Sequence, residues 1–218
     1  MATTKLKIYN GALMLCEQRS IANLSVNEES RRILDEVYDD GGIQYCLEQG
    51  QWRFAMRSSK FTYDTGITPS FGYRRAFAKP DDWVNTSAVC SDEYYQSPLL
   101  AYTDEAGFWY SDLDEIYVKY VSNDANYGMN LSLWPYSFTE YVKAYFASRI
   151  VGKIAAKENL RAAITGRGGI LENAHLTAKN RDSMAEPTKF PPRGNWVQAR
   201  IGDNGSWRDG GNRNQLIG

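Results

Sequence analysis

Few residues in this chain could do chemistry, and the first to consider is His175, the only histidine in 218 residues. A serine or cysteine hydrolase needs an imidazole as its general base, so such a site would have to use His175. The residue falls within a helical pattern beside Asn173 and Thr177, and no nucleophile motif is present. We therefore interpret His175 as a surface or interhelical residue, and a small hydrolase is poorly supported.

Metal and phosphate patterns are equally weak. No HExxH, CxxC or His-rich spacing is present. Residues 165–169 are rich in glycine, but they lack the lysine and the strand-to-helix context of a phosphate-binding loop. Paired acids at positions 39–40, 81–82 and 112/114 could hold a cation, yet acids in turns are usually solvated. The sequence predicts no metal, no cofactor and no enzymatic activity, and indicates a protein that works by contact.

The C-terminal segment, residues 187–218, is the most unusual part of the chain. It holds six of the 18 glycines and three of the seven prolines, and its apolar residues follow no helix or strand period. Such a segment buries too little surface to offset its own ordering entropy. It nevertheless carries residue types that anchor protein interfaces. We interpret it as an arm that orders on a partner; the alternative is a floppy terminus with scattered aromatics. The candidate contact residues are Phe190, Arg193, Trp196, Arg200, Trp207 and Arg208.

Charge separates this arm from the rest of the chain. The arm has a net charge of +3 and residues 1–186 a net charge of −4, within a total of −1. A dedicated nucleic-acid-binding protein needs a concentrated basic face, which an acidic body does not provide. No stretch approaches the roughly 20 apolar residues that span a bilayer, and the N-terminus lacks a signal-peptide core. The three cysteines are widely spaced and indicate buried thiols in a reducing cytoplasm.

Helical periodicity occupies both ends of the acidic body. Apolar residues at steps of three and four predict helices over residues 5–18, 25–48, 138–157 and 160–184. The second of these would begin at a capping box, residues 25–28. Gly41 and Gly42 weaken it midway, because glycine has low helix propensity. The glycines within residues 166–169 predict either a kink in the last helix or a close approach by a neighbouring one.

Between the helices the pattern changes to short aromatic and β-branched runs separated by turn residues, which predict antiparallel strands. These runs cover residues 60–63, 71–77, 84–89, 99–102, 108–110 and 115–121. A proline-led turn is expected at residues 80–83 and a hairpin connection at residues 103–107.

The predicted fold is therefore α+β, with a four-helix body, an inserted small antiparallel β-sheet domain and an extended C-terminal arm. The expected divisions are an N-terminal helical pair, an inserted β domain, a C-terminal helical pair that completes the bundle, and the arm. Their residues are 1–50, 51–134, 135–186 and 187–218.

Motifs spread along the whole chain carry a family resemblance. They are, in order, LKIYNGAL at residues 6–13, ESRRILDEVYD at 29–39, WRFA at 52–55, FAKPDDWV at 77–84, IYVKYV at 116–121 and PPRGNWVQAR at 191–200. With the long helical pattern over residues 159–186, they resemble the tail tubular protein A family, the head-to-tail adaptors (connectors) of tailed bacteriophages. Each motif alone is weak. Residues 16–17 and the glycines within residues 166–169 depart from the helix ends and the regular last helix expected of the family.

The resemblance implies a non-enzymatic virion protein, assembled in the host cytoplasm and located at the interface of head and tail. Copies would form a closed ring, typically twelvefold, between the portal protein and the tail tube or nozzle, with no membrane contact. DNA would pass only transiently through the lumen. The arm would dock on the portal, and the β domain would face the next tail component through Tyr73, Arg75, Trp83 and Trp109.

The basic arm leaves a second interpretation open. The chain could be a cytoplasmic nucleic-acid-associated helical protein that uses its basic, aromatic arm as a clamp, because tryptophan and arginine can stack on bases. The two interpretations differ in what the purified protein should bind. An adaptor should bind portal protein and ignore DNA, whereas a clamp should bind DNA with a steep dependence on salt.

Overall fold

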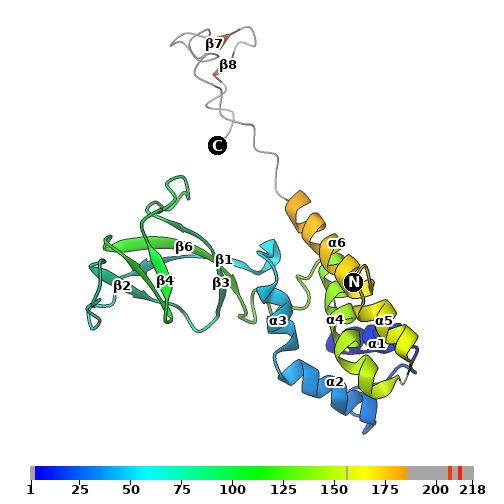
Figure 1. Ribbon diagram of the computed structural model, residues 1–218. Coiled ribbons are helices and arrows are strands. Elements are labelled where there is room, and N and C mark those ends of the chain that lie inside the picture. Colours follow the sequence, from blue (N-terminus) through cyan, green and yellow to red (C-terminus); the bar gives the residue numbers. More distant parts are fainter. Residues whose placement is uncertain (1–2, 156, 186–205, 208–210, 213–218) are drawn as a thin grey trace. The chain divides into compact units, whose positions relative to one another are not determined.

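The computed structural model describes residues 3–155, 157–185, 206–207 and 211–212, and its fold is α+β, as predicted (Figure 1). Contacts divide the chain into two units, residues 1–185 and 186–218. The first unit contains six α-helices and two small sheets. In the second, β7 (Ser206–Trp207) pairs with β8 (Gly211–Asn212), in a segment where the sequence predicted no regular element.

The described residues form six α-helices where the sequence predicted four. They are α1 (Lys5–Leu15), α2 (Glu29–Asp39), α3 (Gly42–Glu48), α4 (Tyr136–Ile154), α5 (Glu158–Thr165) and α6 (Ile170–Met184). The predicted second helix divides because Gly41 adopts a left-handed φ of 81°, which ends one helix and begins another. The predicted last helix divides at Gly168, whose φ is 70°.

The expected capping box is also absent from the start of α2. The backbone N–H of Ser25 donates to Asn23 Oδ1 at 2.9 Å, so a local turn occupies this stretch. The helix begins four residues later, at Glu29, and its N-cap Glu28 makes no side-chain capping bond. In α1, by contrast, the Thr4 hydroxyl accepts from the Lys7 backbone N–H at 3.3 Å.

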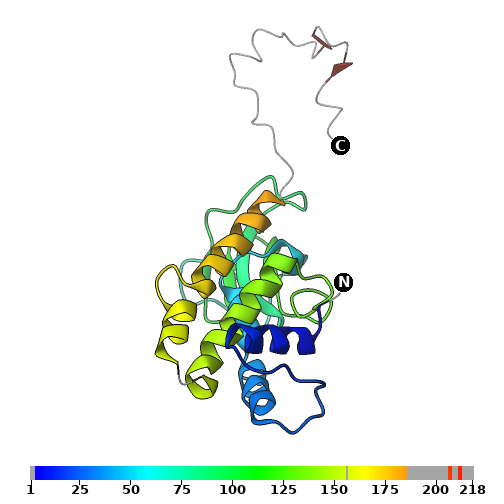
Figure 2. The same cartoon turned by 90° about the vertical axis from the view of Figure 1, so that its right-hand side faces the viewer.

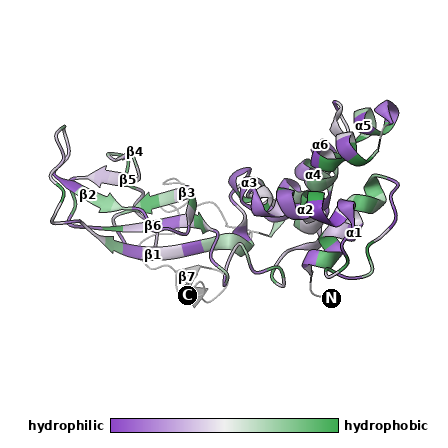
Figure 3. Cartoon of the chain, turned by 90° about the horizontal axis from the view of Figure 1, so that it is seen from below, coloured by the Kyte–Doolittle hydropathy of each residue, from purple (hydrophilic) through white to green (hydrophobic). Residues whose placement is uncertain are grey.

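Six strands form two antiparallel sheets in the middle of the first unit. One has the order β1–β6–β3 and the other the order β2–β5–β4. Their bounds are β1 (Met56–Thr62), β2 (Arg75–Ala78), β3 (Trp83–Cys90), β4 (Thr103–Glu105), β5 (Phe108–Ser111) and β6 (Glu115–Ser122). Figure 3 shows hydrophilic residues recurring along β1 and β6, as expected of strands with one face in a core.

The predictions for strands 84–89 and 115–121 are confirmed by β3 and β6, and the turn at residues 80–83 is present. The prediction of a strand over residues 99–102 is wrong, because the partner of β5 is residues 103–105 instead. Ala106 and Gly107 both have positive φ, 50° and 82°, so these two residues alone form the hairpin turn. The strand predicted over residues 71–77 is also shorter and begins at Arg75.

Two hydrophobic cores stabilise the first unit. The smaller lies between the two sheets and consists of Phe77, Val89, Trp109, Ile116, Val118 and Tyr120. The larger lies among the helices, and Val84 and Val121 extend it into the sheet β1–β6–β3. The sheets and helices are therefore joined by shared core residues, and β1 follows directly on the 3-10 helix η1 (Arg53–Ala55).

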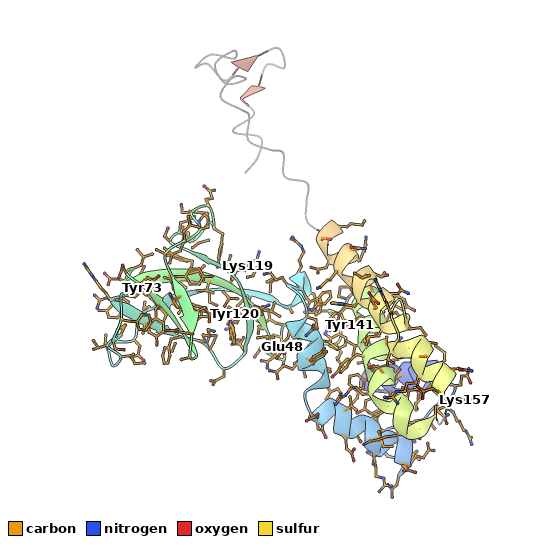
Figure 4. All side chains as sticks on the ribbon, in the orientation of Figure 1. Glu48, Tyr73, Lys119, Tyr120, Tyr141 and Lys157 are labelled. Carbon is orange, nitrogen blue, oxygen red and sulfur yellow. The ribbon has the colours of Figure 1, made fainter. Side chains whose placement is uncertain are left out.

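Helix α4 is central to the helical part, since all five other helices contact it. Figure 2 shows α1 lying across α4, and Figure 4 shows Tyr141 of α4 among the surrounding helices. Leu13 of α1 and Ile150 of α4 have no exposed surface. Both residues belong to the larger core, and Val37 packs against the same core while partly exposed.

Candidate interaction sites

Two of the four residues predicted to face the tail lie at the same end of β2. Arg75 Nε donates to Asp114 Oδ1 at 2.9 Å, and its guanidinium carbon lies 3.9 Å from the ring centroid of Tyr63. Tyr73 packs edge-on against Phe71, which is 42% exposed. We call Tyr63, Phe71, Tyr73 and Arg75 the β2-end patch. Figure 4 labels Tyr73 in the part of the unit formed by the sheets.

The other two residues of that prediction are held in a polar network inside the β region. Trp109 has no exposed surface, and its Nε1 donates to Thr86 Oγ1 at 3.0 Å and to Asp104 Oδ2 at 3.1 Å. Trp83 Nε1 also donates to Thr86, and Lys79 Nζ lies 3.5 Å above the Trp83 ring while paired with Asp104. The prediction is therefore corrected for Trp109, which joins the two sheets and offers no surface to a partner.

The six predicted contact residues of the arm lie outside the residues whose side chains the structure describes. Trp207 falls in the backbone of β7, and the others fall in undescribed stretches. The docking arm thus stays a prediction from sequence.

His175 lies in an open pocket formed by α3, α4 and the junction of α5 with α6. The pocket has a volume of about 380 Å³. The imidazole stacks on the ring of Tyr141, 4.8 Å between centroids, and is hydrogen-bonded to the backbone of Gln49. Tyr45 and Tyr145 stack on each other at 4.8 Å in the same pocket. Burial and the charge of Lys179 lower the pKa of His175, so the imidazole is neutral at pH 7.

This pocket is unsuited to nucleophilic chemistry. The buried His175 Nε2 has no hydrogen-bond partner among the described residues, so no hydroxyl or thiol is poised on it. The Cys46 thiol is hydrogen-bonded to Tyr141, and burial raises the pKa of this thiol far above neutrality. A nucleophilic cysteine requires the opposite shift. The arrangement supports the interpretation of His175 as an interhelical residue.

Two further surfaces were not identified from the sequence, and each of them has large apolar side chains that are exposed. Tyr94 and Leu100, in the loop between β3 and β4, are 74% and 92% exposed. Met14 of α1 and Tyr136 of α4 are 69% and 77% exposed. The adjacent tyrosines of the turn SDEYYQS were the available signal for the first. Met14 had no signal, because it lies among the apolar residues of α1, several of which are buried.

In the described part of the chain, no group of three or more His, Cys, Asp or Glu side chains is placed to hold a metal ion. All three cysteines are buried free thiols, as predicted. None of the described helices is both long and apolar enough to cross a membrane.

Comparison of the sequence with models of known protein families gave no match, and comparison with curated proteins gave none either.

Proposed function

We propose that this chain is a structural virion protein, the head-to-tail adaptor of a tailed phage. Copies form a ring between the portal and the tail tube or nozzle, with DNA passing through the lumen and the C-terminal arm docking on the portal. The sequence motifs at residues 6–13, 29–39 and 191–200 support this proposal.

The structural observation that carries the proposal is the presence of exposed apolar surfaces on two different parts of one unit. Large apolar side chains on the surface of a protein can take part in contacts with other proteins. A closed ring with one kind of subunit uses heterologous contacts, which require two different faces on each copy. The helical part offers Met14 and Tyr136, while the β part offers Tyr94, Leu100 and the β2-end patch.

The arm accounts for the third contact of an adaptor, the one with the portal. Trp196 and Arg200 are four residues apart, in a segment that is too polar to fold alone. Loss of an aromatic or arginine anchor costs about 2 kcal/mol or more, roughly 30-fold in affinity for each subunit. In a ring this loss is multiplied, because each arm binds at a high effective concentration once its neighbours are seated.

Binding of the purified full chain to portal protein and to duplex DNA tests the proposal. An adaptor binds the portal, and its Trp196→Ala/Arg200→Ala variant stays folded but loses that binding. A clamp would instead bind DNA, with an affinity that falls steeply with salt. DNA binding of this kind without portal binding would replace the proposal with the clamp interpretation.

A further inference from the structure

The loop between β3 and β4, residues 91–102, is a candidate contact element at the end of the sheet away from the helices. Cys90, the last residue of β3, pairs with Tyr117 near the start of β6, whereas the helical end of β6 is Val121, opposite Met56. The loop therefore leaves the sheet at its far end. In Figure 1 the sheets occupy the left of the first unit and the helices the right.

This loop has a defined conformation in spite of its exposed apolar residues. Asp92 accepts hydrogen bonds from the backbone N–H groups of Gln96 and Ser97, at 3.0 and 2.7 Å. The Tyr95 hydroxyl donates to the carbonyl oxygen of Val118 at 3.3 Å. Tyr94 nevertheless has 74% of its surface exposed. A fixed loop that presents an aromatic side chain loses little entropy on binding, which is how rigid anchors gain affinity.

The surroundings of Tyr94 are strongly acidic. Residues 80–118 contain nine acids and not one lysine or arginine. Four of these acids form ion pairs with basic residues outside this stretch, namely Asp82, Asp104, Asp114 and Glu115. In the described part of the chain, Asp92 and Glu93 form no such pair. The loop thus combines large apolar side chains with two acids that form no ion pair among the described residues, although the charge of Glu93 also acts on Lys60.

A surface of opposite character lies where α1 crosses α4 (Figure 2). A groove of about 350 Å³ there is lined by Leu6, Lys7, Asn10, Gly11, Met14, Ser20 and Lys143. The lining has two lysines and no acid, and the nearby Glu140 is paired with Lys143 at 2.8 Å. We call this groove, together with Tyr136, the α1–α4 groove.

At the α1–α4 groove, a residue of α1 without a side chain allows close packing of α4 against the helix backbone. A Cβ at Gly11 would lie 2.4 Å from Lys143 Cδ, so glycine allows the Lys143 stem to lie on the backbone of α1. Lys143 Nζ then lies 5.7 Å from the Tyr136 ring centroid, between that ring and the groove that contains Met14. Met14 lines the groove and the exposed Tyr136 lies beside Lys143, so each is a large apolar side chain next to a lysine of the groove. Methionine sulfur packs favourably against aromatic rings.

From these two surfaces we propose that the β3–β4 loop of one copy docks in the α1–α4 groove of the next copy. Tyr94 and Leu100 contact Met14 and Tyr136, and Glu93 faces Lys7 and Lys143. The contact is heterologous, joining a loop on the β part to a groove on the helical part, and its repetition closes a ring when the rotation between neighbouring copies divides a full turn evenly. The inference rests on the proposed adaptor function and names the contact between its subunits.

Cross-linking of two variants, each with one added cysteine, tests this contact while leaving the anchor residues in place. Gln96→Cys puts a thiol on the exposed side of the loop, and Ser20→Cys puts one at the groove. The native cysteines are buried and do not compete. With a short bifunctional maleimide, an equal mixture of the two variants gives a cross-linked dimer, whereas each variant alone gives none. Ser25→Cys, exposed on a different turn, replaces Ser20→Cys as the control and gives no dimer with Gln96→Cys.

A charge exchange gives a second readout on the same assembly. Glu93→Lys weakens association of the copies, and Lys7→Glu in the same chain restores it, because positions 93 and 7 again carry opposite charges at each interface. Tyr94→Ala weakens association by at least about 30-fold without changing the melting temperature.

The outcomes separate this inference from the proposed function. The full chain is observed with and without portal protein, by sedimentation and by electron microscopy. Rings that form without the mixed cross-link, or that resist both Glu93→Lys and Tyr94→Ala, overturn the inference and leave the adaptor proposal standing. A wild-type chain that stays monomeric even with portal protein contradicts the ring itself. If Tyr94→Ala rings form but lose the next tail component, the loop binds that component and the inference is wrong.

Discussion

At the scale of single residues, stability depends on apolar side chains that are completely enclosed. Leu13 of α1 has no exposed surface and lies in the helical core. We expect Leu13→Ala to lower the free energy of unfolding by roughly 2–5 kcal/mol, from lost transfer energy and the cavity left behind. Urea denaturation measures this directly. The neighbouring Met14→Ala, at a 69% exposed position, is the matched control and should change stability little. Equal losses of stability in the two variants would mean that the buried face of α1 is assigned wrongly.

The Asp82 carboxylate accepts hydrogen bonds from three side chains of the β region. It accepts from Arg57 Nη1 at 2.9 Å, from the Tyr120 hydroxyl at 3.2 Å and from the Ser122 hydroxyl. Burial acts to raise the pKa of Asp82, but the bonds from Ser122 and Arg57 outweigh it and lower the pKa below its ordinary value. Ionised Asp82 therefore stabilises the fold above pH about 4, and this contribution is lost as pH falls through the lower folded value.

The variant Asp82→Asn should lose about 1–3 kcal/mol of stability at pH 7, since it leaves Arg57 and two hydroxyls with a weaker acceptor. Its deficit should shrink as the pH is lowered toward 3. The adjacent Asp81 is exposed, so Asp81→Asn serves as the control and should be nearly neutral. A constant deficit of Asp82→Asn across this pH range would contradict the account of the network.

His175 gives the chain a second pH dependence, in a higher range. Burial and Lys179 lower the pKa of the imidazole, against a smaller opposing effect of its bond to Gln49. The folded state thus binds fewer protons than the unfolded state just below pH 6.5, and stability falls as the pH drops from about 7 toward 5. Because no other histidine exists, His175→Gln should flatten thermal stability across this range. The control Leu176→Gln, at an exposed position, should keep the dependence of melting temperature on pH. If that dependence remained in His175→Gln, it could not come from the titration of His175.

At the scale of elements, glycine positions decide where helices end. An added Cβ at Gly169 would lie 2.7 Å from the carbonyl oxygen of Gly166 and 2.8 Å from that of Ala163, so Gly169→Ala should destabilise the turn between α5 and α6. In α4 an added Cβ at Gly152 meets nothing within 4 Å, and Gly152→Ala should stabilise by about 0.5–1 kcal/mol. Thermal melts of the two variants should move in opposite directions. A shift in the same direction would contradict this account of the helix break.

The class of most elements could be predicted from the sequence, but neither their ends nor the short strands β4, β7 and β8 could. Period and composition were enough for the helices at both ends and for β3 and β6, because their apolar residues face one core. The break at Gly41 depends on a left-handed φ, which glycine permits but does not require. The strand Thr103–Glu105 contains only polar residues, and its pairing with β5 comes from the turn at Ala106 and Gly107. Neither a left-handed glycine nor a polar strand of this kind leaves a periodic pattern of apolar residues in the sequence.

The candidate surfaces were harder to predict than the fold, for a similar reason. The presence of an aromatic residue in a strand does not show whether its side chain is buried or exposed. That depends on which strands and side chains pack against it. Trp109 and Tyr73 were both expected to face the tail, yet Trp109 is enclosed between two sheets while Tyr73 lies at an open end beside Phe71. The α1–α4 groove depends on Gly11 and Lys143, which are far apart in sequence. Only the three-dimensional structure brings them together.

At the scale of the whole molecule, one chain offers several surfaces for different neighbours. Under the proposed function, the β3–β4 loop and the α1–α4 groove would join adjacent copies, the β2-end patch would contact a tail component, and the basic arm would dock on the portal. The arm carries the opposite net charge to residues 1–186, and contacts assign it to a separate unit. We therefore expect removal of the arm to alter portal capture without altering the core of the first unit. A chain ending at residue 185 should melt at the wild-type temperature and fail to bind portal protein. Unchanged portal capture by this shortened chain would move the contact onto the helices.

Electron microscopy of purified portal protein mixed with the full chain tests the central claim most directly. The adaptor account predicts a ring of density, typically twelvefold, added coaxially to one face of the portal with an open channel through both. The Trp196→Ala/Arg200→Ala variant should leave the portal bare under the same conditions. A wild-type chain that leaves the portal bare, while it binds duplex DNA with a steep dependence on salt, would contradict the account.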